Sequence, residues 1–439
     1  MKNWNRWLLS GAVAIGVALL VAAPVAQAAG FGIFEAGAKA TGMGGAYVAV
    51  ADDGSSMFYN PAGLASNDKF YVSVGDTLIA PQSKFYGDNP YPGAGTTASQ
   101  QRQIFFPPNF FVAVPVSKGV NVAFGTWFPN GLSTSWQNPD TFAGRFLSQR
   151  VDLRQYAFGL QLSAQLADWL SVGAGPELRV SDVKLQRNAA AYNMFTGRFV
   201  DVAHLNLVGD SFATGVTWGA GIQIKPTQEL SIGASYHNKI DQKYTGKATL
   251  YQISTGNPYL DGAVAATYPL NTPVPAETTL QYPSIAQFGI GYKVSSCFTV
   301  SAAAVWTGWD VFNQTVFSFS SVNGKQIPAE TLVHNWKNAW SYRFGVDYQA
   351  TPKLNLLAGI VYDQTPQPDA DVSPLLPDAN RTGYSIGLGY KIGKATTVEL
   401  SNLFLFFHDR STNGAQVDGF NGTYKTFADL LVLNLKTSF

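Results

Sequence analysis

Polar and apolar residues alternate strictly in several stretches of this chain. Three clear examples are LSVGAGPELRV at 170–180, WSYRFGVDYQ at 340–349 and GYSIGLGYKI at 383–392. In each, one face is apolar or aromatic, and the other carries mostly Gly, Ser and Gln with few charges. A period of two indicates β-strands. A soluble sandwich would also alternate, but its outward face would be charged. The pattern therefore favours a transmembrane wall that turns every second side chain toward lipid.

The spacing of the connectors predicts how many strands this wall has. Short connectors lie at 117–119, 167–169, 225–228, 295–297, 350–353 and 392–395. They alternate with longer stretches rich in Gly, Pro and Asn, near 81–101, 129–150, 188–210, 254–276, 319–336, 364–379 and 409–423. Short turns on the periplasmic side and long loops outside are typical of outer-membrane barrels. The sequence therefore predicts an all-β transmembrane barrel of fourteen antiparallel strands that starts near Lys69.

The last stretch, FADLLVLNLKTSF at 427–439, supports the same class. Leu431, Leu433, Leu435 and Phe439 fall on one face, and the chain stops at the aromatic residue. Outer-membrane barrels characteristically end in such a strand. An alternating strand closed by a terminal Phe is a stronger signal than the Phe alone.

The first residues resemble an export signal. Lys2 and Arg6 precede an apolar run from Trp7 to Val25, and Ala26-Gln27-Ala28 is a small-x-small cleavage pattern. These features predict a signal peptide at 1–28. An uncleaved membrane anchor is the alternative, and the Ala-x-Ala exit favours cleavage.

Composition excludes several other classes of protein. Only 13% of the residues are charged, against about 25% in soluble domains, and no other run of about 20 apolar residues follows the signal. The single Cys297 cannot form an intrachain disulfide. A net charge of +1 argues against nucleic acid as a partner. No motif indicates a metal, a nucleotide or a redox cofactor, so no cofactor is expected.

Residues 29–68, between the signal and the first strand, predict a plug, called the hatch below. From Ala29 to Ala65, 17 of 37 residues are Gly or Ala, without sustained alternation. A fourteen-stranded barrel is too wide for its own side chains to fill. The motif Asn60-Pro61-Ala62-Gly63 predicts a turn that acts as a hinge or lock. A periplasmic leader is the alternative, but it would leave aromatic residues in water. The barrel would then occupy 69–439.

Four blocks of the sequence resemble a known family. They are GFGIFEAGAKATGMGGAYVAVADDGSSMFYNPAGLA at 30–65, NPDTFAGRF at 138–146, HNWKNAWSYRFGVDY at 334–348 and DQTPQPDADVSPLLPDANRTGYSIGLGYK at 363–391. They are similar to the long-chain fatty acid transporters of Gram-negative outer membranes, of the FadL and TodX type (OMPP1). The resemblance spans essentially the whole chain. It implies a monomeric barrel surrounded by outer-membrane lipid and lipopolysaccharide, plugged by a hatch with the Asn-Pro-Ala motif, that transports hydrophobic molecules.

The resemblance also implies a route for the ligand. Family members catch it in a groove of the extracellular loops and pass it to a luminal pocket near the mature N-terminus, where Phe31 and Phe34 lie in this chain. After a hatch movement, the ligand leaves beside a kinked third strand. The loop candidates are the apolar residues Met194, Phe195, Phe199, Leu205, Leu207, Tyr259, Leu260, Val264 and Leu270. The alternative is that these loops simply pack on each other.

The lateral exit has a candidate in VNVAFGTWFPNG at 120–131. Gly125, Pro129 and Gly131 would interrupt the ladder of the third strand. Such a break in a membrane wall is either filled by the hatch or used for passage. Pro129 could instead begin the following loop, and both interpretations stay open.

A fatty acid carboxylate would need a cationic partner in the lumen. The alternation places Lys337 and Arg343 on the lumen-facing side, and Lys337 resembles a family position that meets the ligand head group. Arg145 and Arg381 are further candidates. Each could instead form a structural ion pair, with Glu177, Asp347, Glu35, Asp52 or Asp53. These cations favour fatty acids over aromatic hydrocarbons, which some family members transport.

Two rival functions receive less support from the sequence. A lipid-hydrolysing barrel would need a Ser/His pair on the wall. Of the four histidines, His204, His237, His334 and His408, only His237 lies within an expected strand, and no Ser motif pairs with it. A general diffusion porin would lack the hatch. We therefore expect a transporter rather than an enzyme.

Overall fold

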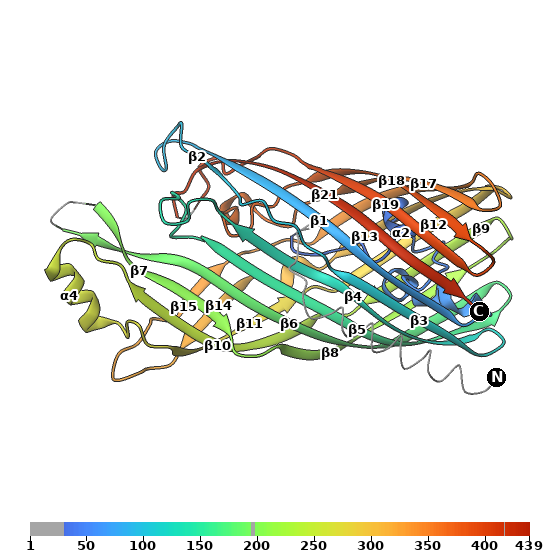
Figure 1. Cartoon of the computed structure of the whole chain (residues 1–439), viewed down its shortest axis with the longest axis horizontal. Helices are drawn as coiled ribbons and strands as arrows, with labels where there is room; N and C mark the ends of the chain where they lie inside the picture. Colours follow the sequence, from blue (N-terminus) through green and yellow to red (C-terminus); the bar gives the residue numbers. More distant parts are fainter. Residues whose placement is uncertain (1–29, 195–197, 417) are drawn as a thin grey trace.

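The computed structural model describes residues 30–194, 198–416 and 418–439, so the expected signal peptide at 1–28 lies outside the described residues. Within them, fourteen antiparallel strands close into a barrel (Figure 1). Each pairs with the next, and β21 pairs with β1 along its whole length. The strands are β1 Tyr71–Gly87, β3 Pro108–Ser117, β4 Val120–Ser135, β5 Arg150–Ala167, β6 Leu170–Asn193, β8 Ala213–Ile224, β9 Leu230–His237, β12 Ile285–Ser295, β13 Phe298–Thr307, β16 Ala339–Gln349, β17 Leu354–Asp363, β18 Arg381–Ile392, β19 Thr396–Phe407 and β21 Gly422–Ser438. The predicted strand number is confirmed.

The predicted alternation is confirmed along the wall. On β18, the outward residues Tyr384, Ile386, Leu388, Tyr390 and Ile392 are 39% to 62% exposed. Their neighbours Gly383, Ser385 and Gly389 are buried. The outward residues that close the chain, Leu431, Leu433, Leu435 and Phe439, are exposed in the same way. An exposed apolar belt around a closed barrel is the surface that contacts acyl chains. Among the residues that the structure describes, no helix is long and apolar enough to cross a membrane.

The long connections are more ordered than the sequence suggested. All six short connectors are turns, as predicted, but strands continue well into the stretches expected to be loops. For example, β6 runs to Asn193 and β4 to Ser135. Further strands extend the sheet beyond the barrel: β7 Arg198–Gly209, β10 Ile240–Gln252, β11 Val274–Tyr282, β14 Gln314–Phe319 and β15 Glu330–Val333, with the short β2 Thr97–Ser99 and β20 Arg410–Ser411. Gly, Pro and Asn did not mark the strand ends, because strand pairing continues past them.

One end of the molecule carries these extensions and the other carries the short turns. In Figure 1, β7, β10 and helix α4 (Pro258–Thr267) stand at one end, and the C-terminus lies at the other. Helix α4 begins where the side chain of Asn257 accepts hydrogen bonds from the backbone of Tyr259 and Leu260. Two short 3₁₀ turns, η3 Trp309–Val311 and η4 Asp369–Asp371, complete the extracellular side.

The hatch fills the lumen near the end with the short turns. Its elements are α2 (Ala38–Gly42), α3 (Ser56–Tyr59) and η2 (Pro61–Ser66), and most of its described residues are buried. The α2 helix lies inside the wall formed by β17, β18 and β19 (Figure 1). The η2 turn packs on β5, β6 and β8. The predicted plug is therefore present.

Glycines on the wall let the hatch backbone approach closely. A Cβ atom on Gly173 would lie 2.5 Å from the carbonyl carbon of Pro61, and a Cβ atom on Gly233 would lie 2.2 Å from the carbonyl oxygen of Val48. Both glycines belong to the polar face of their strands. The glycines of this face therefore mark where the hatch backbone lies against the wall.

Candidate functional site

An apolar cavity of about 410 Å³ lies in the lumen above the hatch and is called the inner cavity below. Its apolar lining comes from the outer halves of strands and from the loops that follow them. It is formed by Phe31, Leu132, Leu147, Val151, Leu153, Val183, Leu185, Leu207, Leu280, Phe312, Phe317, Leu332, Val333, Trp336, Leu375 and Leu376, among others. Of the described hatch residues, only Phe31 lines it. The cavity has the size and character of a site for a small or flexible apolar ligand.

Aromatic rings enclose Phe31. Its ring centroid lies 4.6 Å from that of Trp309, 5.1 Å from Phe312, 5.7 Å from Trp336 and 5.9 Å from Tyr282. Edge-to-face packing of this kind stabilises each pair beyond simple burial. The start of the hatch is thus held by four rings, and two of them, Phe312 and Trp336, also line the cavity.

A polar group behind the cavity holds two of its rings in place. The Nε1 atom of Trp336 donates to Asp371 Oδ2 at 2.6 Å, and His334 Nδ1 lies 3.2 Å from the same carboxylate. The His334 ring stacks on Phe312, with centroids 4.3 Å apart. Asp371 therefore orients the rings that contact Phe31.

A second cavity, of about 340 Å³, lies in the extracellular extension and is called the outer cavity below. Small and branched apolar residues of the β6–β7 and β10–β11 hairpins line most of it, including Leu205, Val264 and Leu270. Arg187 and Glu330 line both cavities and form an ion pair with each other. The boundary between the two apolar spaces is therefore a pair of opposite charges.

The Asn-Pro-Ala motif fixes the hatch to the wall. The side-chain amide of Asn60 donates to the carbonyl oxygens of Val48 at 2.8 Å and Ile222 at 3.0 Å, and its oxygen accepts from the backbone of Ala62. The carbonyl of Pro61 accepts from Ser163 Oγ at 2.6 Å. Asn60 is extended, as the following proline requires. The motif thus joins two hatch segments to β5 and β8.

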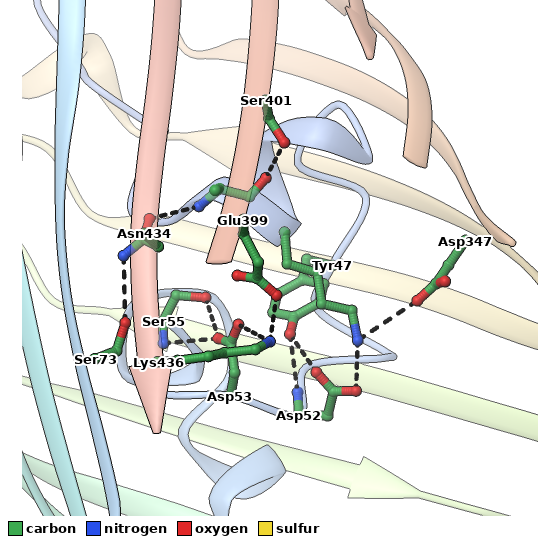
Figure 2. Close-up of polar contacts among 12 residues, drawn as sticks. Tyr47, Asp52, Asp53, Ser55, Ser73, Asp347, Glu399, Ser401, Asn434 and Lys436 are labelled. Atoms are coloured by element: carbon green, nitrogen blue, oxygen red, sulfur yellow. Dashed lines mark hydrogen bonds and ion pairs between the residues drawn. The ribbon is translucent and has the colours of Figure 1, made fainter. Parts of the chain in front are cut away.

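A second set of polar contacts fixes the other side of the hatch (Figure 2). Lys39 donates to Asp52 at 2.6 Å and lies 3.5 Å from Asp347 on β16. Burial would lower the pKa of Lys39, but these two carboxylates raise it above its usual value. Lys436 on β21 pairs with Glu399 on β19, and its Nζ lies 3.8 Å from Asp53 of the hatch. These ion pairs connect the hatch to the last strands of the barrel.

Backbone contacts in the same region support these ion pairs. The backbone N–H of Ala38 donates to Asn434 Oδ1 at 2.9 Å, and Ser401 Oγ donates to the carbonyl of Ala38 at 2.7 Å (Figure 2). Burial raises the pKa of the nearby Glu35 above its usual value, although the positive charge of Arg343 acts in the opposite direction. The first helix of the hatch is therefore bonded at both its backbone and its side chains.

The third wall strand is interrupted where the sequence suggested. The pairing of β4 with β5 shifts between Trp127 and Asn130, and β3 pairs with β4 only as far as Thr126. Beyond that point the hatch takes the place of β3. Ile33 N–H donates to the carbonyl of Pro129 at 2.9 Å, and Gly131 N–H donates to the carbonyl of Phe31 at 2.8 Å. Pro129 therefore lies in a bulge within a strand and does not begin a loop, and Gly125 lies just before the bulge.

None of the four predicted cationic residues lines either cavity. Lys337 is exposed, and the neighbouring Trp336 lines the inner cavity instead. The expectation that Lys337 shares the lumen-facing side with Arg343 is wrong, because β16 begins only at Ala339 and its alternation does not extend to 337. Arg343 is buried against the hatch, with its guanidinium 4.8 Å from the Phe34 ring and 3.6 Å from Asp363. Arg145 binds both oxygens of Asp201.

The predicted apolar residues are divided among several places. Phe31 lines the inner cavity and Leu205 the outer one. Phe34 packs inside the hatch beside Phe58, with centroids 6.0 Å apart. Phe199 is exposed and Leu260 lies on α4, and neither lines the inner or the outer cavity. Phe195 lies outside the described residues. Arg381, another cationic candidate, pairs with Asp363.

Several residues of this site were missed by sequence reasoning. Arg187 and Glu330 lie in stretches that were expected to be strand end and loop, and nothing in the sequence pairs them. Trp309 and Phe312 follow β13 in a short turn. A signal did exist: Arg187 is a charged residue in a run that otherwise turns apolar, LQRNAAAY at 185–192. The contact with Glu330 could not be predicted, since 143 residues separate the two.

Residues 19–439 match the model of a family described as outer membrane protein transport protein (OMPP1/FadL/TodX). The chain belongs to this family. It is therefore an outer-membrane transport protein for hydrophobic compounds, of a Gram-negative outer membrane, and the family consists of transport channels.

Individual relatives are distant in sequence but similar in structure. A long-chain fatty acid transport protein of Escherichia coli is 22% identical over 89% of this chain and 90% of its own length. The structure of a Pseudomonas aeruginosa FadL homologue covers 94% of this chain and 100% of its own at 21% identity, with a TM-score of 0.81. The structure of the P. putida toluene transporter TodX covers 93% of this chain and 99% of its own at 17% identity, with a TM-score of 0.75. At these identities, the two structures confirm the fold.

Proposed function

We propose that this protein takes up long-chain fatty acids. The observation that carries the proposal is Arg187, the only Lys or Arg among the described residues that line either cavity. A carboxylate that enters a low-dielectric space needs a cationic hydrogen-bond donor, and a guanidinium can bind both its oxygens. Glu330 neutralises Arg187 while no ligand is present. An incoming carboxylate would take the place of Glu330, and the apolar tail would occupy the inner cavity.

The proposed route has three further steps. The ligand is first caught in the outer cavity, whose lining of small apolar residues suits an acyl chain. It then passes Arg187 into the inner cavity and displaces the Phe31 ring. Because the carbonyl of Phe31 bonds Gly131, movement of Phe31 would loosen the hatch segment that fills the break at β4. The ligand would leave sideways through that break into the outer membrane.

Uptake of monoaromatic hydrocarbons is the second candidate. The enclosure of Phe31 by Trp309, Trp336 and Phe312 supports it, because a ring that displaced Phe31 would find the same partners. The ion pair between Arg187 and Glu330 would then stay closed and serve only to hold the loops. The two candidates therefore differ in what Arg187 contacts.

We propose cleavage after Ala28, a hatch at 29–68 and a barrel at 69–439 that works as a monomer surrounded by lipid and lipopolysaccharide. The molar mass of the protein in detergent micelles, measured by light scattering, tests directly whether it is a monomer.

Competitive binding to the purified barrel tests the ligand. A long-chain fatty acid and a monoaromatic hydrocarbon would compete on the wild type, on Arg187→Met and on Lys337→Ala. We expect Arg187→Met to weaken fatty acid binding about tenfold or more, because a charge-assisted hydrogen bond is lost, and to leave hydrocarbon binding unchanged. Lys337→Ala is the matched control, since Lys337 is exposed and outside both cavities.

Glu330→Gln sharpens the same test. This variant frees Arg187 from its partner and should strengthen fatty acid binding. If the hydrocarbon binds as well as the fatty acid and both substitutions are silent, the protein transports hydrocarbons and Arg187 is structural.

A further inference from the structure

His237 connects the wall of the barrel to the hatch. It lies at the end of β9 and is 2% exposed. Its Nε2 atom lies 2.7 Å from the carbonyl oxygen of Phe58, and its Nδ1 atom lies 2.8 Å from Glu177 Oε1 on β6. Phe58 is two residues before Asn60 of the Asn-Pro-Ala motif. A single side chain thus spans from a wall carboxylate to the hatch backbone.

Both partners of His237 are hydrogen-bond acceptors. A carbonyl oxygen cannot donate, and Glu177 is held as a carboxylate by Arg179, with which it also forms an ion pair. Neutral histidine carries one N–H and one acceptor nitrogen, so it could satisfy only one of the two contacts. Only the doubly protonated imidazolium donates in both directions.

The surroundings of His237 suit a positive charge. Among the described residues, the charged groups that face it are Glu177 and, behind that carboxylate, Arg179, whose guanidinium lies 6.0 Å from the Trp127 ring. Strand β8 lies between β6, which carries Glu177, and β9, which carries His237, and Gly219 of β8 lies beside both side chains. A Cβ atom there would lie 2.7 Å from Glu177 Oε1 and 2.8 Å from His237 Nδ1. The contact across β8 therefore exists because residue 219 has no side chain.

Two other wall residues hold the hatch backbone beside His237. Gln287 Nε2 on β12 also donates to Phe58 O, at 3.2 Å, and Ser235 Oγ donates to the carbonyl of Tyr59 at 2.6 Å. The ring of Phe58 stacks on His237 with centroids 5.7 Å apart. The backbone just before the motif is thus held from two wall strands, and the charged donor is the stronger of these bonds.

We propose that His237 is a positioning residue of the transporter: as an imidazolium oriented by Glu177, it holds the Phe58 carbonyl and keeps the Asn60–Gly63 motif seated on the wall. Movement of this part of the hatch requires that bond to break. The inference depends on the proposed function only in assuming that the hatch moves during uptake.

Nitrogen-15 NMR of the histidine rings tests the charge state. The chain has four histidines, and His237→Gln identifies the signal of residue 237 by its loss. We expect protons on both ring nitrogens of His237 in the folded protein, because each nitrogen faces an acceptor. We also expect this signature to be lost in Glu177→Gln. A ring with a single proton in the wild type would overturn the proposal.

Chemical labelling of the hatch tests the positioning role. Ala65→Cys, placed in a Cys297→Ser background, puts a thiol at a fully buried position of η2. We expect a maleimide to label it about tenfold faster after His237→Gln, because loss of the charged bond raises the population with an unseated hatch. His408→Gln is the matched control, since His408 is exposed and away from the hatch. His237→Lys, which keeps a charged donor, should restore part of the protection.

These measurements need no ligand, so they can fail independently of the proposed substrate. Heat-dependent migration in gels checks that both variants are folded. Equal labelling rates in folded His237→Gln and His408→Gln would show that His237 has no positioning role. If labelling changes as expected but neither fatty acid nor hydrocarbon binds, only the proposed function fails.

Discussion

The two cavities and the contact between hatch and wall are built from different chemistry. The inner and outer cavities, of about 410 and 340 Å³, are lined mainly by apolar side chains. The hatch–wall contact encloses a smaller space of about 160 Å³ that is lined mostly by polar and charged side chains. Elsewhere in this contact, backbone carbonyls, ion pairs and glycines determine its geometry. Side-chain volume is adjustable, whereas hydrogen bonds and backbone contacts are not. The difference suggests that ligands of varied shape are accommodated above a plug that has one fitted position.

The largest expected effect comes from the buried charges of the hatch contact. Lys436→Met leaves Glu399 and Asp53, whose side chains are 6% and 9% exposed, without their shared cation. Removing one partner of a buried ion pair costs about 3 kcal/mol. We expect the free energy of unfolding, measured by urea titration in lipid vesicles, to fall by about that amount.

A surface ion pair provides the control for this substitution. Lys425 pairs with Asp409, and both side chains are more than half exposed, at 52% and 57%. Lys425→Met should therefore change stability far less, since solvent already screens the pair. Equal losses in the two variants would mean that burial of the hatch contact contributes nothing, and the contrast between the cavities and this contact would disappear.

The next largest effect concerns the close approach of the hatch backbone. Gly173→Ala places a Cβ atom 2.5 Å from the carbonyl carbon of Pro61, where backbone atoms must move. We expect a loss of about 1–3 kcal/mol in stability and measurable ion conductance in planar bilayers as the hatch lifts. Gly389→Ala is the control, because its nearest atom would be at 3.5 Å, an ordinary contact.

The cavities should respond differently to a comparable change. Leu185→Met alters the shape of the inner-cavity lining at nearly constant volume. We expect the free energy of unfolding to fall by less than about 1.5 kcal/mol, and the barrel to show no ion conductance. A conducting Leu185→Met barrel together with a silent Gly173→Ala barrel would reverse the proposed division between an adjustable cavity and a fitted plug.

The barrel was predictable because membrane strands follow a period of two. The faces of β6, β16 and β18 could be assigned from single stretches, and the connector lengths gave the strand number. Strand ends beyond the membrane were not predictable. Gly87 and Pro129 look like loop residues, yet Gly87 pairs with Gly422 of β21, and Pro129 lies in a bulge within β4.

The site was predictable only where local chemistry determines it. The turn at Asn60-Pro61 and the small residues of the hatch follow from backbone sterics, and the break at β4 follows from Pro129. Lys337 was misplaced because alternation was extended beyond the start of a strand. The pairs Arg187–Glu330 and Glu177–His237 join residues far apart in sequence, and only the closed barrel brings them together.

The smallest expected effect concerns Asp52, the most exposed member of the hatch contact. Burial raises the pKa of Asp52, but Lys39 and Lys436 outweigh burial and hold it at about 2, below its usual 3.8. A lowered pKa means that the carboxylate stabilises the folded protein above pH 3.8 and loses this contribution as the pH falls toward about 2. Because its side chain is 54% exposed, solvent and salt screen the attraction. Asp52→Asn should therefore lower the unfolding temperature slightly at neutral pH and low salt. The effect should be much smaller near pH 2, where about half of the Asp52 carboxylates are protonated, and in high salt. A large loss that persists in high salt would show that Asp52 is shielded from solvent, and the two sides of the hatch would then be held equally firmly.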